Sequence, residues 1–267
     1  MKRFFNILLS VFAILVIFSS QAQAKVTEFI QVTDLHFALN EKSVQNFDDL
    51  INFINTKLKD AEFIVFTGDN IDKAQKKTLV EFLKMCKKLN KPYYIEIGNH
   101  DCFKSQKLDK VTYAKLVAQY SHQKHKDFNF VVKHNGLIFI FVDGMKEVIP
   151  SRNGYFREAQ LTWLDEQLTK YKDKKVIIFQ HFPLIPESEK QSSHDLYMVE
   201  NYWDMLAKHD NIKAIIAGHY HKVQEQKVNG VLHITTPPAR YTHRKLRYIV
   251  VDDSKHNFEI YSSIIDF

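Results

Sequence analysis

Residues 62–70 read EFIVFTGDN, a run of β-branched and aromatic residues that leads directly into Gly68-Asp69. A short unbroken apolar run of this kind predicts a strand buried on both faces, with a polar group at its carboxyl end. The same pattern recurs along the chain, separated by amphipathic stretches. Buried strands that alternate with helices predict an α/β fold with a largely parallel sheet covered by helices.

Further strands are expected wherever such runs occur before the last third of the chain. The predicted strands are Phe29–Thr33, Phe63–Thr67, Tyr93–Ile97, Leu137–Val142, Val176–Gln180 and Ala214–Ala217. Apolar residues at helical spacing predict helices between them. These helices cover residues 47–58, 79–89, 110–121, 158–171 and 196–208.

The last third of the chain changes to short strands. They are predicted at Val223–Val228, Val231–Thr235, Leu246–Val251 and Phe258–Ser262. Asn229-Gly230 lies between the first two, and this dipeptide is typical of a tight hairpin turn. We therefore expect a second sheet packed on the first. No internal repeat and no linker of Gly, Ser and Pro divides residues 25–267, which predicts one domain.

The N-terminal segment, residues 1–24, has the pattern of an export signal. Lys2 and Arg3 precede an apolar stretch from Phe4 to Phe18, and Ala22-Gln23-Ala24 offers the small residues that a signal peptidase accepts. The stretch is shorter than the ~20 residues that span a bilayer. We predict a cleaved signal, a periplasmic or secreted protein and no stable membrane insertion after cleavage. The alternative is an uncleaved membrane anchor.

Composition is that of a globular protein, with 45% hydrophobic and 25% charged residues. Removal of residues 1–24 takes away two positive charges, so the net charge falls from +6 to +4. The lysines are scattered, which suits an anionic substrate and argues against nucleic acid as a partner. Cys86 and Cys102 are the two cysteines. In an exported chain they form either a disulfide or two buried thiols.

Carboxylates and imidazoles follow the predicted strands. The segments are Asp34-Leu35-His36, Gly68-Asp69, Gly98-Asn99-His100-Asp101, His181 and Gly218-His219-Tyr220-His221. Strand alternation is expected to place both Asp34 and His36 on one side of the backbone. Open α/β sheets hold their sites at the carboxyl ends of strands. These side chains are ligands for divalent metals, so the pattern predicts a metal site that acts on phosphate oxygens.

In this order the segments resemble the calcineurin-like metallophosphoesterase superfamily, whose blocks run Asp-x-His, Gly-Asp, Gly-Asn-His-Asp/Glu, His and Gly-His-x-His. The resemblance extends from Asp34 to His221. It implies a four-layer αββα sandwich of two mixed sheets flanked by helices.

The resemblance also implies roles for the individual residues. One ion would be held by Asp34, His36, Asp69 and His221, and the other by Asp69, Asn99, His181 and His219. Both are divalent, with Mn, Fe and Zn left open. They would share a hydroxide that attacks a phosphate mono- or diester of a small substrate. His100 would face the phosphoryl group and Asp101 would orient its ring.

Residues within and beside the motifs distinguish the subfamilies of this superfamily. Phe37 after His36, and Asp101 at the end of the third block, depart from the protein Ser/Thr phosphatases. Asp72 stands where purple acid phosphatases have a Tyr ligand, and His100 stands where lipid-sugar pyrophosphatases have Arg. The chain is most similar to the bacterial group that includes cyclic-nucleotide phosphodiesterases. The alternatives are a nuclease and a non-catalytic phosphate-binding protein, and the oligomeric state stays open.

Three other features have both a functional and an ordinary interpretation. His194 lies in a polar insert between two metal-bearing segments, from which it would reach a substrate. Residues 151–154 form either a wall of the site or a simple turn. Arg240 and Arg244 follow Pro237-Pro238 and would either contact phosphate or be solvated.

Overall fold

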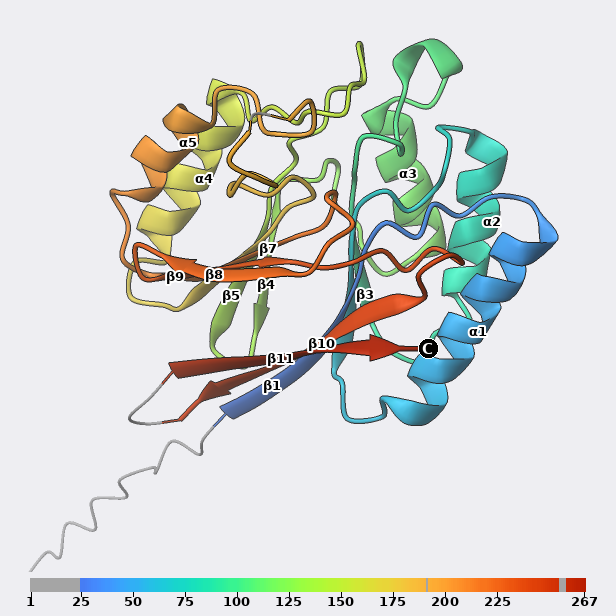
Figure 1. The fold of residues 1–267 in the computed structure, drawn as a ribbon, viewed down its shortest axis with the longest axis horizontal. Helices are drawn as coiled ribbons and strands as arrows, with labels where there is room; N and C mark the ends of the chain where they lie inside the picture. The colour runs from blue at the N-terminus through green and yellow to red at the C-terminus, as the bar shows by residue number, and fades with distance from the viewer. Residues whose placement is uncertain (1–24, 191, 255–257) are drawn as a thin grey trace, which may run out of the picture.

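Two β-sheets face each other, and helices cover both outer faces, in the computed structural model (Figure 1). It describes residues 25–190, 192–254 and 258–267. The predicted αββα sandwich is confirmed. The predicted export signal, residues 1–24, lies outside the described residues. None of the helices in the described ranges is long and apolar enough to cross a membrane.

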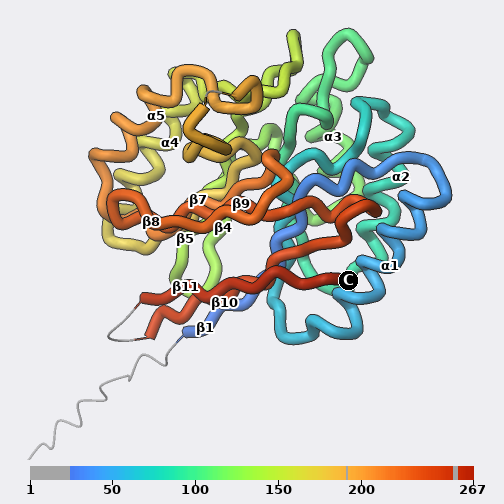
Figure 2. The backbone as a smooth tube through the Cα atoms, viewed as in Figure 1, coloured from blue at the N-terminus to red at the C-terminus, as the bar shows by residue number. Residues whose placement is uncertain are grey.

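The first sheet joins the two ends of the chain. Its order is β11-β10-β1-β2-β3, with β1 to β3 parallel, β10 antiparallel to β1, and β11 antiparallel to β10. In Figure 2 the C-terminal strands run beside the N-terminal one. The strands are β1 (Lys25–Val32), β2 (Phe63–Thr67), β3 (Tyr93–Glu96), β10 (Lys245–Asp253) and β11 (Phe258–Asp266).

The second sheet has the order β4-β5-β6-β7-β9-β8. Its central strands are parallel, and an antiparallel hairpin forms each edge. The predicted turn between β8 and β9 is confirmed, with Asn229 and Gly230 both at positive φ, as a tight hairpin requires. The strands are β4 (Phe130–His134), β5 (Leu137–Phe141), β6 (Val176–Phe179), β7 (Ile212–Ala217), β8 (Gln224–Val228) and β9 (Val231–Thr235).

Each helix buries its apolar stripe against one sheet. The first three pack on the first sheet, and the last two pack on the second. Side chains cap two of them: Asn40 accepts a hydrogen bond from Ser43 N, and Asp109 accepts one from Thr112 N. The helices are α1 (Glu41–Lys57), α2 (Lys76–Cys86), α3 (Lys110–Tyr120), α4 (Glu158–Lys170) and α5 (Val199–Leu206). A short 3-10 helix, η1, spans Lys104–Gln106.

Alternation along the strands divides the core into layers. In β1, Phe29 points between the sheets, whereas Ile30 points towards the helices. The layer between the sheets is rich in phenylalanine, and the rings of Phe29 and Phe63 stack with centroids 5.0 Å apart. Because both faces of the central strands are covered, their sequences are continuous apolar runs.

One expectation about the sheets is wrong, and one strand was missed. The C-terminal strands do not build a sheet of their own, because β8 and β9 complete the second sheet whereas β10 and β11 complete the first. Strand β4 was not predicted; it is an edge strand, and only its first residue is fully buried. Of the two alternatives for the cysteines, the structure has the two thiols and not the disulfide, since Cys86 and Cys102 are both free and buried.

Candidate metal centre

The predicted metal ligands lie together at the carboxyl ends of strands from both sheets. Three groups of three have ligand atoms within 4.8 Å of one another: Asp34 with His36 and His221, Asp69 with His181 and His219, and His36 with Asp69 and His100. The remaining predicted ligand, Asn99, places its Oδ1 3.3 Å from His181 Nε2. The fold thus gathers every residue that the sequence nominated as a ligand.

The local backbone differs from the expected alternation. β1 ends at Val32, before Asp34 and His36, and β7 ends at Ala217. Asp34, His36 and Asp69 have φ of 51°, 46° and 50°, and His219 and His221 have 71° and 55°. These left-handed conformations are unfavourable for residues with a Cβ. The side chains therefore converge through strained turns, and extended-strand geometry does not account for their placement.

Asp34 is fully buried and only partly satisfied. Its Oδ2 accepts hydrogen bonds from Thr33 Oγ1 at 2.7 Å and from His219 N at 2.9 Å. Its Oδ1 has no hydrogen-bond partner in the described structure and lies 3.2 Å from His221 Nε2. A buried carboxylate oxygen without a partner is costly, unless a cation approaches it.

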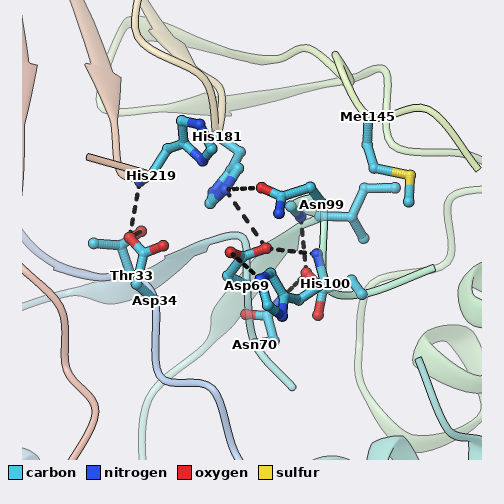
Figure 3. Close-up of polar contacts among 12 residues, drawn as sticks. Thr33, Asp34, Asp69, Asn70, Asn99, His100, Met145, His181 and His219 are labelled. Atoms are coloured by element: carbon cyan, nitrogen blue, oxygen red, sulfur yellow. Dashed lines mark hydrogen bonds and ion pairs between the residues drawn. The ribbon is translucent and has the colours of Figure 1, made fainter. Parts of the chain in front are cut away.

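Asp69 lies among Asn99, His100 and His181 in Figure 3, and its two oxygens face different imidazoles. Its Oδ1 is 3.5 Å from His181 Nε2, and its Oδ2 is 3.7 Å from His36 Nε2. His100 N donates a hydrogen bond to Oδ1 at 2.9 Å, which fixes the carboxylate plane. One carboxylate thus faces ligands of two groups with different oxygens.

Backbone carbonyls set the tautomers of two imidazoles. His181 Nδ1 lies 2.9 Å from Thr67 O, and His219 Nε2 lies 3.1 Å from His194 O. A carbonyl can only accept a hydrogen bond, so in its neutral form His181 has Nε2 as its free ligand atom and His219 has Nδ1. Such partners are typical of metal-binding histidines. His194, proposed from sequence for its side chain, contributes here through its carbonyl.

The glycine at 98 permits close packing of this cluster. A Cβ on Gly98 would lie 2.2 Å from Asp69 Oδ1 and 2.8 Å from His181 Cε1. Because both neighbours are predicted ligands, any side chain here would displace them.

Charge coupling favours ionised carboxylates. Burial alone would raise the pKa of Asp34, but the close approach of His221 and the charge of His181 lower this pKa to about 2. Burial opposes ionisation of Asp69 too, yet His181 holds the pKa of Asp69 well below its usual range. Burial lowers the pKa of His181, but Asp69, Asp34 and the carbonyl of Thr67 together raise it to about 9. Burial, together with the charge of His181, lowers the pKa of His219 to about 3. The cluster therefore offers anionic oxygens to a cation.

Residues 27–223 match the family described as calcineurin-like phosphoesterase. The chain belongs to this family. Its activity is metal-dependent hydrolysis of phosphate esters, as the family and the clustered ligands together indicate.

Bacterial relatives of this phosphoesterase are similar over most of their length. A protein of Arcobacter nitrofigilis named "Probable glycerophosphodiester phosphodiesterase" is 26% identical over 222 residues, which are 77% of this chain and 76% of the relative. A "Probable cyclic nucleotide phosphodiesterase" of Coxiella burnetii is 26% identical over 244 residues, 89% of this chain and 93% of the relative. Among solved structures, a dimetal phosphatase of Danio rerio has a TM-score of 0.63 at 16% identity, covering 88% of this chain and 98% of its own. That last likeness shows the fold.

The expected contact between Asp101 and the ring of this phosphoesterase's His100 is not formed. His100 Nδ1 instead lies 2.7 Å from the carbonyl of Asp72. Asp101 points away into the fold, where its carboxylate accepts hydrogen bonds from Gly98 N at 2.8 Å and Ile71 N at 3.1 Å. Burial and Asp69 raise the pKa of Asp101 to about 7. Asp101 therefore shapes the loop, and the prediction that it orients the ring is wrong.

Asp72 is the site residue whose role the sequence did not reveal. Besides its carbonyl contact with His100, its carboxylate lies 3.8 Å from His36 Nδ1. Burial lowers the pKa of His100, but Asp69 and the hydrogen bond to Asp72 O outweigh it and raise this pKa. The only available signal was that Asp72 replaces the Tyr of purple acid phosphatases.

Arg244 is held by other parts of the fold, which neither of its two interpretations foresaw. Its Nη1 lies 3.0 Å from Asp49 Oδ2, and its Nε donates to the carbonyl of Phe267. These bonds tie the loop after β9 to α1 and to the C-terminus. Arg244 is thus occupied by structural contacts.

Proposed function

We propose that this chain is an exported phosphodiesterase that uses two divalent cations held by the gathered ligands. The observation that carries the proposal is the position of Asp69, whose two oxygens face His181 and His36 at 3.5 and 3.7 Å. A carboxylate placed in this way is suited to bridge two ions. The printed names of the relatives from Arcobacter and Coxiella support a diester as the substrate. The N-terminal segment, residues 1–24, supports export.

The donor set fits the cations. One would be held by Asp34, His36, Asp69 and His221, and the other by Asp69, Asn99, His181 and His219. The grouping of Asp34 with His36 and His221, and of Asp69 with His181 and His219, supports this division. Imidazole, carboxylate and amide groups suit Mn, Fe and Zn. Bound there, two such ions would lower the pKa of a water molecule towards neutrality and offset negative charge on phosphoryl oxygens.

His100 is placed to donate a proton to the leaving oxygen. Its Nδ1 is held by the carbonyl of Asp72, so Nε2 is the nitrogen that faces the cluster, 4.0 Å from Asp69 Oδ2. The His100 side chain is 42% exposed, which leaves it accessible to substrate. General acid catalysis of this kind contributes about 10²- to 10⁴-fold.

Hydrolysis of bis-p-nitrophenyl phosphate and p-nitrophenyl phosphate, with and without added Mn²⁺, tests the proposal. We expect the diester to be the better substrate and its hydrolysis to require metal. His100→Ala should keep the wild-type metal content and lose about 100-fold or more in kcat. The matched control is His122→Ala, since His122 packs on the rings of Tyr93 and Tyr94.

One result would refute the proposed activity, and another would refute only the role of His100. A purified protein with two metals that hydrolyses neither ester is not a phosphodiesterase of this kind. A normal kcat in His100→Ala would remove His100 from the reaction while leaving the metal assignment intact.

A further inference from the structure

A cleft of about 250 Å³ opens beside His100. Asn99 and His100 line it on the side of the metal centre, and Lys73, Phe103 and Arg152 line it elsewhere. Its walls come from the loop after β2, the loop that carries η1 and the loop after β5. A hydrogen bond from Lys104 N to Glu147 O joins the last two of these loops. Small-molecule sites usually measure ~300–1,000 Å³, so this cleft suits one part of a substrate.

Two cationic side chains of the cleft have no protein partner. Lys73 and Arg152 are exposed, and neither side chain makes a hydrogen bond or ion pair within the described part of the chain. The acidic residue of the lining is Asp72, whose carboxylate lies 3.8 Å from His36 Nδ1. The cleft therefore has more positive than negative charge.

The position of the cleft relative to His100 decides which part of a substrate it would hold. On the proposed function, on which this inference rests, His100 gives its proton to the leaving oxygen. The group attached to that oxygen must extend from His100, and the cleft is the space that His100 borders. Phe103 supplies an apolar wall for the carbon part of such a group.

We propose that this cleft binds the leaving group of the diester, and that Lys73 and Arg152 select leaving groups that carry a second negative charge. The substrate class is thus phosphodiesters of an alcohol that also bears a phosphate or carboxylate. Lys73 and Arg152 are specificity-determining residues, and they take no part in the bond cleavage itself.

A pair of chromogenic diesters tests the selectivity directly. One is methyl 4-nitrophenyl phosphate, and the other is methyl 3-carboxy-4-nitrophenyl phosphate, which differs by one carboxylate on the leaving group. Each kcat/KM is divided by the rate of the same ester in hydroxide solution, which corrects for leaving-group acidity. Two exposed ion pairs should favour the carboxylated ester roughly tenfold. The preference should shrink as ionic strength rises.

Variants assign the preference to the cleft. Lys73→Met and Arg152→Met should each lower the ratio of the two corrected kcat/KM values about threefold, and the double variant should bring it to about one. The matched control is Lys172→Met, which removes the same charge from an exposed lysine just after α4. It should leave the ratio at its wild-type value. Metal content and Tm show that each variant is folded.

The possible failures are distinguishable. A wild-type ratio near one, or a ratio that survives in the double variant, overturns the assignment of the cleft and leaves the proposed function standing. If neither ester is hydrolysed, the proposed function fails. Binding of the product 5-hydroxy-2-nitrobenzoate then decides whether the cleft is an anion site. Weaker binding to Lys73→Met and Arg152→Met than to Lys172→Met would still identify an anion site. Equal binding to all three would overturn it.

Discussion

Gly218→Ala should remove metal from the site without unfolding the protein. A Cβ at this position would lie 1.9 Å from Thr33 Oγ1 and 2.6 Å from Asp34 Oδ2. Neither atom is free to move away, because Thr33 is 1% exposed and Asp34 Oδ2 also accepts a hydrogen bond from His219 N at 2.9 Å. The substitution therefore acts on a predicted ligand through its pinned neighbours.

The size of the effect follows from these distances. Ordinary van der Waals contact begins at 3.4 Å, so Asp34 Oδ2 must move by about 0.8 Å from its 2.6 Å position. Metal sites tolerate deviations of about 0.2 Å. A misplacement approaching 1 Å costs about 100-fold in rate. Overpacking a buried position costs about 1–3 kcal/mol, which lowers Tm by roughly 2–4 °C per kcal/mol in a chain of this size.

Elemental analysis, kcat on bis-p-nitrophenyl phosphate and Tm measure the three effects. Gly230→Ala is the matched control, because Gly230 also gains a Cβ, has φ of 82° and has no atom within 4 Å of that Cβ. It should lose about 1–2 kcal/mol through backbone strain alone and keep its metal and kcat. Adding Thr33→Ala to Gly218→Ala removes the 1.9 Å contact but not the 2.6 Å one, so stability should recover more than kcat. A Gly218→Ala protein with wild-type metal content and kcat would show that Asp34 is not a constrained ligand.

Three further predictions concern other parts of the chain. Asp69→Asn should lower metal content at both positions, and elemental analysis that finds one full equivalent remaining would contradict a bridging role. Burial, together with Asp143, raises the pKa of Glu96 well above its usual range. The stability due to this raised pKa is full below the unfolded value of ~4.3 and is lost as pH rises through the folded pKa. The difference in Tm between Glu96→Gln and the wild type should therefore shift in favour of the variant as pH rises from 5 to 8. For Glu166→Gln, at an exposed position, the difference in Tm should stay constant. Expression of the full chain in a bacterium should yield a mature N-terminus at Lys25, and N-terminal sequencing that starts at Met1 would instead indicate an uncleaved anchor.

The positions of the ligands were predictable because strand ends are visible in the sequence. Apolar runs such as Phe63–Thr67 end where the covered part of a strand ends, and parallel strands meet at one edge. Asp69 and His181 could therefore be expected to converge although they lie far apart along the chain. Their conformations were not predictable, because positive φ at non-glycine residues depends on contacts that tertiary structure alone supplies.

No local feature of the sequence indicates which sheet the C-terminal strands β8 to β11 join. β10 pairs with β1, so its partner lies more than two hundred residues away, as in the pair Lys25 and Asp253. Alternation reports that a strand is covered but not which sheet it joins. β4 (Phe130–His134) was also not predicted. It is an edge strand that is mostly half-buried, so its sequence lacks a continuous apolar run. The sequence did not reveal that Asp101 accepts hydrogen bonds from the backbone of Gly98 and Ile71, whereas the ring of His100 contacts the carbonyl of Asp72.

The strained turns of the metal centre are held by one another. Asp34 N donates to Gly68 O at 3.0 Å, His36 N donates to Asp69 O at 2.9 Å, and Gly218 N donates to His181 O at 3.0 Å. Each left-handed residue costs about 1–2 kcal/mol, and each such hydrogen bond returns about 1 kcal/mol. Since the bonds join the loop after β1 to that after β2, and the loop after β6 to that after β7, no ligand can relax alone. The strain thus persists because relief at one ligand would break the hydrogen bonds that position the next.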